Sequence, residues 1–173
     1  MDELTTIIGD YRSFLQHIIA EVQQAGFEMT DFVQLDHMCY RTASLEQYQT
    51  KKEKLTSVAQ LLGEVEVNKR PIAVLRLNTP IYYEGWRIDS IEIPAPKPGV
   101  ETDEGLEHIE FVLYDGQETF LQKYASKSFD LKAAGRGINP EVTFVLPTYK
   151  VKFHLLNLPT VVYLEHKLGL TNI

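Results

Sequence analysis

The sequence predicts an α+β fold in which two βαβββ modules form one cupped mixed β-sheet, with an extra helix at the N-terminus. The first observation is an internal repeat: the triplet Leu-Asp-His at residues 35–37 recurs as Leu-Glu-His at residues 106–108, and each copy opens an apolar stretch. The second observation is that the expected elements follow each triplet in the same order, a strand, a helix and then further strands. Together these features indicate a duplicated unit.

The 173 residues, 44% of them hydrophobic and 24% charged, have the size and composition of one globular domain. We expect residues 1–30 to form an N-terminal helix packed on the body, 31–99 the first module, and 100–173 a second, shortened module with a C-terminal helix. Apolar residues from Leu4 to Val22 follow helical spacing, and Gly26 is placed to end this helix. The helix either covers a face of the repeated body or pairs with a second chain.

The first module is predicted to begin with a strand near residues 34–42. Ser44 and Gln47 have the spacing of a capping box, so a helix follows, and Gly63 closes it. Three extended segments come next, at about 63–70, 71–78 and 86–96, until a run of prolines ends the last one.

The polar stretch 97–105 is predicted to link the modules. The second module then has a strand at 106–115, a short helix at 118–126, and strands at about 140–147 and 149–156. The tail is ambiguous: residues 161–166 resemble a last strand, whereas Pro159 and Gly169 are typical of the start and end of a helix. We favour a short terminal helix.

Charge and composition exclude several classes of partner. A net charge of −7 leaves no excess of basic residues for nucleic acid or an acidic membrane. The chain has one cysteine, Cys39, so an intrachain disulfide and a cysteine-rich zinc site are both excluded. Neither a secretion signal nor a membrane-spanning run is evident, so a cytoplasmic location is expected. A small-molecule substrate remains as the expected partner, and any metal would be held by His, Asp and Glu.

Strand alternation predicts which side chains face the hollow of the cup. His37 and Arg41 share one face of the first strand, and Asp36 and Met38 share the opposite face. The same alternation directs His108 away from the helices. The last strands of the two modules add Glu92 and His154 to the same side, and the four candidate metal ligands are therefore His37, Glu92, His108 and His154. Imidazoles with a carboxylate suit a divalent ion such as Zn, Ni, Mn or Fe(II).

The fourth ligand has a rival. If residues 161–166 form a strand, Glu165 stands about as far beyond His108 as Glu92 stands beyond His37. The spacing therefore favours Glu165, whereas the helix signals in the tail favour His154.

Three other side chains on this face have open roles. Glu110 either acts as a base, orients the His108 imidazole, or pairs with Arg41. Arg41 either holds an anionic group of a substrate or bridges to Glu110 or Glu92. Cys39 is interpreted as a small buried residue.

Four segments, LDHMCYR, IEIP, GLEHIEFVL and VKFH, make the chain resemble the vicinal oxygen chelate superfamily of glyoxalases and extradiol dioxygenases, and within it the YecM family. The resemblance covers roughly residues 31–157 and the preceding helix. It implies a metal ligand on the first and last strand of each module: His37, Glu92 and His108, with His154 or Glu165 as the fourth. The superfamily usually has a glutamate at that last position, whereas here the second module is shortened.

The expected function is a metal-dependent enzyme, of isomerase, lyase or dioxygenase type, acting on a small oxygen-rich molecule. A divalent metal would bind vicinal oxygens of the substrate and stabilise an enolate or oxyanion. In this interpretation Glu110 is the catalytic base and Arg41 binds the substrate. The alternative is a protein of the same fold that binds or sequesters a small molecule without catalysis.

Overall fold

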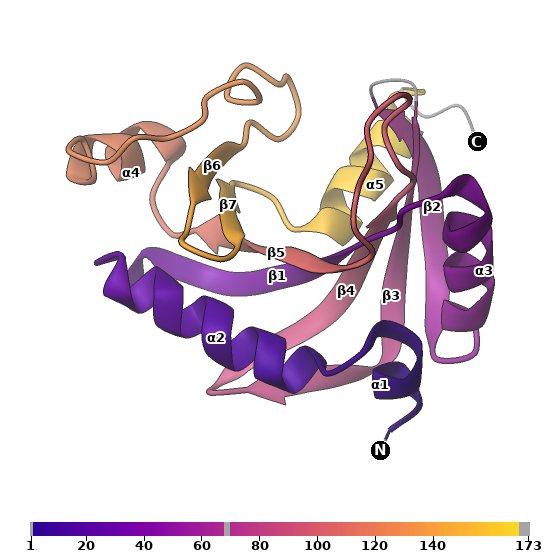
Figure 1. Cartoon of the computed structure of the whole chain (residues 1–173). Coiled ribbons are helices and arrows are strands. Elements are labelled where there is room, and N and C mark those ends of the chain that lie inside the picture. Colours follow the sequence, from indigo (N-terminus) through magenta and orange to yellow (C-terminus); the bar gives the residue numbers. More distant parts are fainter. Residues whose placement is uncertain (1, 68–69, 170–173) are drawn as a thin grey trace.

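The computed structural model describes residues 2–67 and 70–169. Residue 1 of the N-terminal segment, residues 68–69 of the first module and residues 170–173 of the second module lie outside the described part. The strands are β1 (Phe32–Arg41), β2 (Ala59–Val67), β3 (Arg70–Tyr83), β4 (Trp86–Pro94), β5 (Gly105–Leu113), β6 (Val142–Val145) and β7 (Lys150–His154). They form one curved mixed sheet in the order β2-β3-β4-β1-β5-β7-β6 (Figure 1).

The predicted fold class is confirmed, with one difference in the second module. β1 and β5, which contain the two repeated triplets, lie antiparallel at the centre, and each has the last strand of its own module, β4 or β7, as a parallel neighbour. Within the described residues the second module has three strands where the first has four, and a single bridge between Asp130 and Thr143 lies beyond β6. The turn-rich segment 131–141 has too few alternating apolar residues to form a further strand.

The helices are α1 (Glu3–Ile8), α2 (Tyr11–Gln24), α3 (Leu45–Leu55), α4 (Gln117–Lys123) and α5 (Leu158–Lys167), with a 3₁₀ turn at Met29–Asp31. The single N-terminal helix that we expected is therefore two. Gly9 has φ of 85°, which ends α1, and the Asp10 side chain accepts a hydrogen bond from the Ser13 amide to begin α2.

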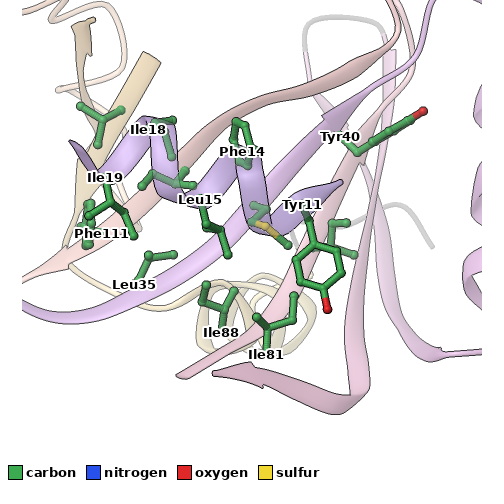
Figure 2. Close-up of a cluster of buried hydrophobic side chains, with 14 of the residues drawn as sticks. Tyr11, Phe14, Leu15, Ile18, Ile19, Leu35, Tyr40, Ile81, Ile88 and Phe111 are labelled. Atoms are coloured by element: carbon green, nitrogen blue, oxygen red, sulfur yellow. The ribbon is translucent and has the colours of Figure 1, made fainter. Parts of the chain in front are cut away.

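The hydrophobic core lies between α2 and the convex face of the sheet (Figure 2). Phe14, Leu15 and Ile18 of α2 belong to one buried cluster with Leu35 of β1 and Phe111 of β5. Each such side chain contributes about 1.5–3 kcal/mol on burial. This burial determines which side of β1 and β5 faces the helices, and so directs the histidines to the concave side.

The tail is a helix, as the punctuation by Pro159 and Gly169 indicated. Asn157 caps α5 by accepting a hydrogen bond from the Thr160 amide, and Pro159 lies in its first turn. α5 lies inside the cup, on the opposite side of the sheet from α3 (Figure 1). None of the helices in the described ranges is long and apolar enough to cross a membrane.

Candidate metal centre

Four side chains from three adjacent strands converge in the hollow of the cup. His37 comes from β1, Glu92 from β4, and His108 and Glu110 from β5, and one potential ligand atom of each lies within 4.8 Å of the others. The His108 Nε2 atom is 3.1 Å from Oε1 of Glu110 and 3.4 Å from Oε1 of Glu92. The His37 Nε2 atom is 3.4 Å from the same Glu110 oxygen. All four side chains are at most 14% exposed.

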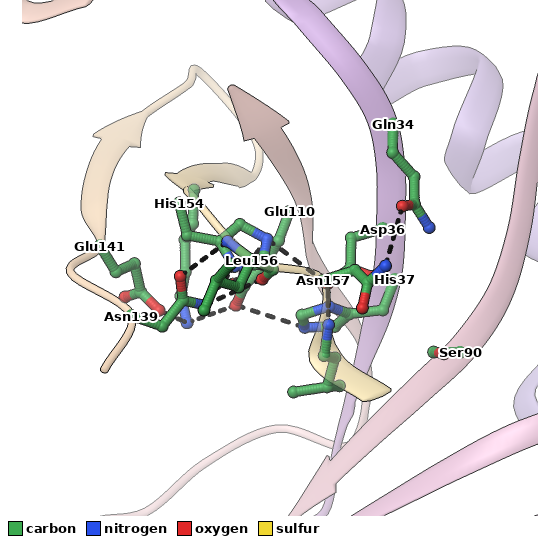
Figure 3. A network of polar contacts seen from close by, with 12 residues as sticks. Gln34, Asp36, His37, Ser90, Glu110, Asn139, Glu141, His154, Leu156 and Asn157 are labelled. Atoms are coloured by element: carbon green, nitrogen blue, oxygen red, sulfur yellow. Dashed lines mark hydrogen bonds and ion pairs between the residues drawn. The ribbon is translucent and has the colours of Figure 1, made fainter. Parts of the chain in front are cut away.

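Two β-bulges shape this site, one in each repeat. Asp36 is the extra residue of β1, between the pairs Leu35 with Phe111 and His37 with Glu110. The bulge corrects the expectation that Asp36 and Met38 share a face, because an extra residue breaks the strict alternation of side chains. Asp36 therefore lies beside His37 on the concave side (Figure 3).

The equivalent acid of the second repeat, Glu107, is the extra residue of β5. It lies between His108, which pairs with Cys39, and Leu106, which pairs with Tyr40. The repeated triplet thus folds into the same local geometry twice.

Each bulged acid lies behind the imidazole that follows it in the chain. Oδ2 of Asp36 is 2.9 Å from Nδ1 of His37, and Oε2 of Glu107 is 3.4 Å from Nδ1 of His108. The Nε2 atoms therefore point forward, and that of His37 has no hydrogen-bond partner among the described residues. A carboxylate behind Nδ1 with Nε2 directed at other carboxylates is typical of imidazoles that bind a metal ion.

The buried cluster carries a net negative charge unless its imidazoles are protonated or a cation binds. Burial opposes the charged form of His37, but the carboxylates of Glu110 and Asp36 outweigh it and raise its pKa to about 10. Burial likewise raises the pKa of Glu110, yet the ammonium of Lys152 and the His37 imidazole hold it well below its usual range. With neutral imidazoles, the carboxylates of Asp36, Glu92 and Glu110 beside one lysine leave an excess of two negative charges. Two protons or one divalent ion would neutralise it.

Lys152 is the main residue of the site to which the sequence interpretation gave no role. Its ammonium donates a hydrogen bond of 2.8 Å to Oε1 of Glu110. On the first module Glu92 pairs with Cys39, and on the second Lys152 pairs with Glu110. Because the repeat relates Cys39 to Glu110, Lys152 occupies the position equivalent to Glu92, where the resemblance implied a fourth ligand.

His154 lies two residues further along β7 and is oriented as a hydrogen-bond donor. The side-chain oxygen Oδ1 of Asn139 accepts hydrogen bonds from the backbone amides of Leu155 and Leu156. The side-chain nitrogen Nδ2 of Asn139 must therefore be the group that lies 2.7 Å from Nδ1 of His154. Nδ1 is thus an acceptor and the proton is on Nε2, which lies 3.4 Å from Oδ2 of Asp36. Burial lowers the pKa of His154 and keeps it neutral. The structure therefore groups His154 with Asp36 and His37, and Figure 3 shows these side chains near Glu110.

Of the remaining candidates, Arg41 and Glu165 lie outside the four-residue cluster, whereas Cys39 lies beside His108. Arg41 is at the end of β1, where Nη1 donates to Oε1 of Glu107 at 2.8 Å, so its carboxylate partner is neither Glu110 nor Glu92. Glu165 is on α5, half-buried, and belongs to none of the described metal-ligand groups. Cys39 is fully buried and burial raises the pKa of its thiol to about 12, which keeps it a thiol.

A further acid, Glu141, was also missed. Its Oε2 lies 3.4 Å from the ammonium of Lys152 and 3.6 Å from Nη1 of Arg136. Burial, followed by the nearby charge of Glu110, raises the pKa of Glu141. The sequence did contain a signal for Asp36 and Glu107, because an acidic residue precedes the histidine in both repeated triplets. No sequence pattern indicated a role for Glu141.

The chain has the vicinal oxygen chelate class of fold, in which two copies of one module form a single cupped sheet. Imidazoles and carboxylates from both copies lie in the hollow of that sheet. Streptomyces coelicolor methylmalonyl-CoA epimerase, a member of that superfamily solved with 2-nitronate-propionyl-CoA, superposes with a TM-score of 0.51 at 15% identity, over 72% of this chain and 97% of that one. At this identity the likeness shows the fold alone. Within this class the chain belongs to the YecM family, because the family model described as YecM protein matches residues 3–165.

Two relatives support the assignment. Protein YecM of Escherichia coli (strain K12) is 30% identical over 122 residues, 69% of this chain and 63% of that protein. An uncharacterised protein of Haemophilus influenzae is 27% identical over 112 residues, 65% of this chain and 58% of that protein. The alignments thus span less than two thirds of either relative. A solved structure described as Protein EC4020 has a TM-score of 0.77 at 24% identity, over 95% of this chain and 94% of that one.

Proposed function

We propose that His37, Glu92 and His108 bind one divalent transition-metal ion, and that the protein is a metal-dependent enzyme acting on a small, oxygen-rich organic molecule. The observation that supports this most directly is the pair of imidazoles, each with a carboxylate behind Nδ1 and with Nε2 directed at Glu110 or Glu92. Two imidazoles and a carboxylate suit Zn, Ni, Mn or Fe(II), and three protein ligands leave positions for substrate oxygens.

The bound ion would supply Lewis-acid stabilisation of negative charge on a substrate oxygen. Glu110 is the proposed proton acceptor, because its carboxylate lies between the two Nε2 atoms and is therefore adjacent to anything bound there. Lys152 holds this carboxylate in place through a hydrogen bond to Oε1. His154 directs its Nε2 proton toward the same site and is proposed as a hydrogen-bond donor in place of the ligand role first expected.

The test is metal analysis of protein purified without chelator, followed by titration of chelator-treated protein with Zn, Ni and Mn. We expect one ion per chain and a rise in the unfolding midpoint Tm, since an ion that binds the folded state stabilises it. His37→Ala, Glu92→Gln and His108→Ala should each abolish both effects, whereas Glu110→Gln should retain the ion. His17→Ala, on the exposed side of α2, is the matched control. Stoichiometric metal in His37→Ala, or none in the wild type, would contradict the proposal.

A further inference from the structure

A cavity of about 620 Å³ lies beside the candidate metal centre, between the start of α5 and strands β1, β3 and β4. We name it the arginine pocket, after Arg76 and Arg87; Trp86, Asp89, Asn157 and Tyr163 also line it. None of the three proposed metal ligands lines it, so this pocket is a separate site.

The wall of the arginine pocket adjoins His37 on two sides. Asp89 accepts a hydrogen bond of 3.2 Å from Ser90, which is the strand partner of His37. At the start of α5, next to Asn157, the Leu158 amide donates to Oδ2 of Asp36, the oxygen that also contacts His37 (Figure 3). A molecule in this pocket therefore lies next to the candidate metal centre.

The pocket has more positive charge than its one carboxylate neutralises. Arg87 contacts Oδ2 of the buried Asp89 at 2.5 Å, whereas Nη2 of Arg76 is 3.8 Å from the same oxygen. Asp89 is the only carboxylate within ion-pair distance of Arg76 among the described residues. Both arginine side chains line the pocket and are 52% exposed. In a chain of net charge −7 this local excess of positive charge favours an anion.

The remaining lining is aromatic and amide-bearing. Trp86 is half-buried and its ring lies 5.5 Å from that of Phe111 at an angle of 68°. Tyr163 of α5, which is 59% exposed, also lines the pocket. We propose that the arginine pocket binds a small organic anion: a phosphate or carboxylate held by Arg76 and Arg87, on a molecule whose planar or apolar part lies against Trp86 and Tyr163. Guanidinium groups bind both kinds of oxyanion through paired hydrogen bonds. If the ligand of this pocket is the substrate of the metal centre, which rests on the proposed function, the substrate has an anionic group at one end.

The test uses phenyl phosphate and benzoate as probes, with chelator-treated full-length protein, by calorimetry and thermal unfolding. Because the pocket needs no metal, we expect saturable binding of phenyl phosphate or benzoate in the presence of EDTA, and the stronger probe identifies the oxyanion. Inorganic phosphate should bind more weakly than phenyl phosphate, because it lacks the part that contacts the aromatic wall. Failure of both aromatic probes to bind would overturn the inference.

Arg76→Gln is the decisive variant, because it leaves the Arg87 pair with Asp89 intact. Arg76→Gln should weaken binding of the stronger probe about tenfold or more, because one charge-assisted hydrogen bond to the oxyanion is lost. It should not lower Tm. Arg12→Gln, on the exposed side of α2, should change nothing. Equal binding by wild type and Arg76→Gln would overturn the inference. If the protein binds phenyl phosphate but takes up no metal, the pocket is supported and the proposed function is rejected. If it takes up metal but binds neither aromatic probe, the proposed function is supported and the pocket is rejected.

Discussion

At the scale of single residues, Lys152 changes the chemistry expected of this cup. Lys152 occupies the position that the repeat makes equivalent to Glu92, and the hydrogen bond from its ammonium to Glu110 neutralises one carboxylate of a crowded, buried group. Burial disfavours the charged lysine, yet Glu110 and Glu141 outweigh burial and raise the pKa of Lys152. The site therefore has a permanent internal cation beside the position proposed for the metal.

Replacing Lys152 by Gln should separate the effects of that cation on folding and on metal binding. Without metal, the buried Glu110 carboxylate loses its partner, and we expect the free energy of unfolding to fall by about 3 kcal/mol. Metal affinity should rise, because the site becomes more negative. Urea unfolding with and without metal measures both effects. Lys150→Gln removes only a half-exposed pair with Glu107 and should cost at most about 1 kcal/mol. Equal losses in the two variants would contradict this account.

The raised pKa of His37 predicts the pH dependence of metal binding. In the metal-free folded protein the imidazole stays protonated until the pH approaches about 10, so its stabilising contribution is complete below about 6.5 and disappears as the pH rises through about 10. A metal ion must displace this proton. Its affinity should therefore increase between about pH 6 and pH 8, up to about tenfold per pH unit for each proton displaced. Competition with a chromophoric chelator measures this, and an affinity independent of pH would contradict it.

At the scale of elements, the concave face is organised by the segments that cover it. The side chain of Asn139, in the segment before β6, makes hydrogen bonds to Leu155, Leu156 and His154 and thereby joins that segment to the end of β7. A few residues later, Asn157 caps α5 and begins the helix that lies in the cup.

The two asparagines should differ in their contribution to stability. Asn139→Ala leaves two backbone amides and a buried imidazole without their partners, and we expect a loss of about 2–3 kcal/mol. Asn157→Ala removes one helix cap, which typically costs about 1 kcal/mol. Chemical unfolding of the two variants makes the comparison. A smaller loss for Asn139→Ala than for Asn157→Ala would show that the segment before β6 is not held through this side chain.

At the scale of the whole molecule, the duplication makes the two halves of the site comparable. Asp36 and Glu107 are related by the repeat, each on a bulge and each behind its own histidine. Asp36 and His37 are fully buried, whereas Glu107 is 19% exposed and also binds Arg41. The same local design therefore operates in two environments.

Asp36→Asn and Glu107→Gln should both weaken metal binding, by about 10–100-fold, since each removes the charge that orients an imidazole. The effect of Asp36→Asn should be the larger, because Asp36 and His37 form a buried hydrogen bond of 2.9 Å, whereas Glu107 lies 3.4 Å from His108 without forming a hydrogen bond. Glu46→Gln, on the exposed side of α3, is the control. Metal titration of the chelator-treated variants gives the affinities. Unchanged affinity in both variants would contradict the role of the bulged acids.

The sequence alone determined the duplication, the fold class, the terminal helix and the side of the sheet on which His37 and His108 lie. These features follow from repeats, apolar periodicity and residues typical of helix ends, which are all visible as patterns along the chain. Glu92 followed from strand parity, which holds where a strand is regular. Parity failed at Asp36, where a bulge interrupts the alternation of β1. Only the tertiary structure decided the position of Lys152 against Glu110, the tautomer of His154, and the pocket around Arg76 and Arg87. Each depends on the register between separate strands or on contacts between distant segments, and a linear pattern of residues does not contain that information.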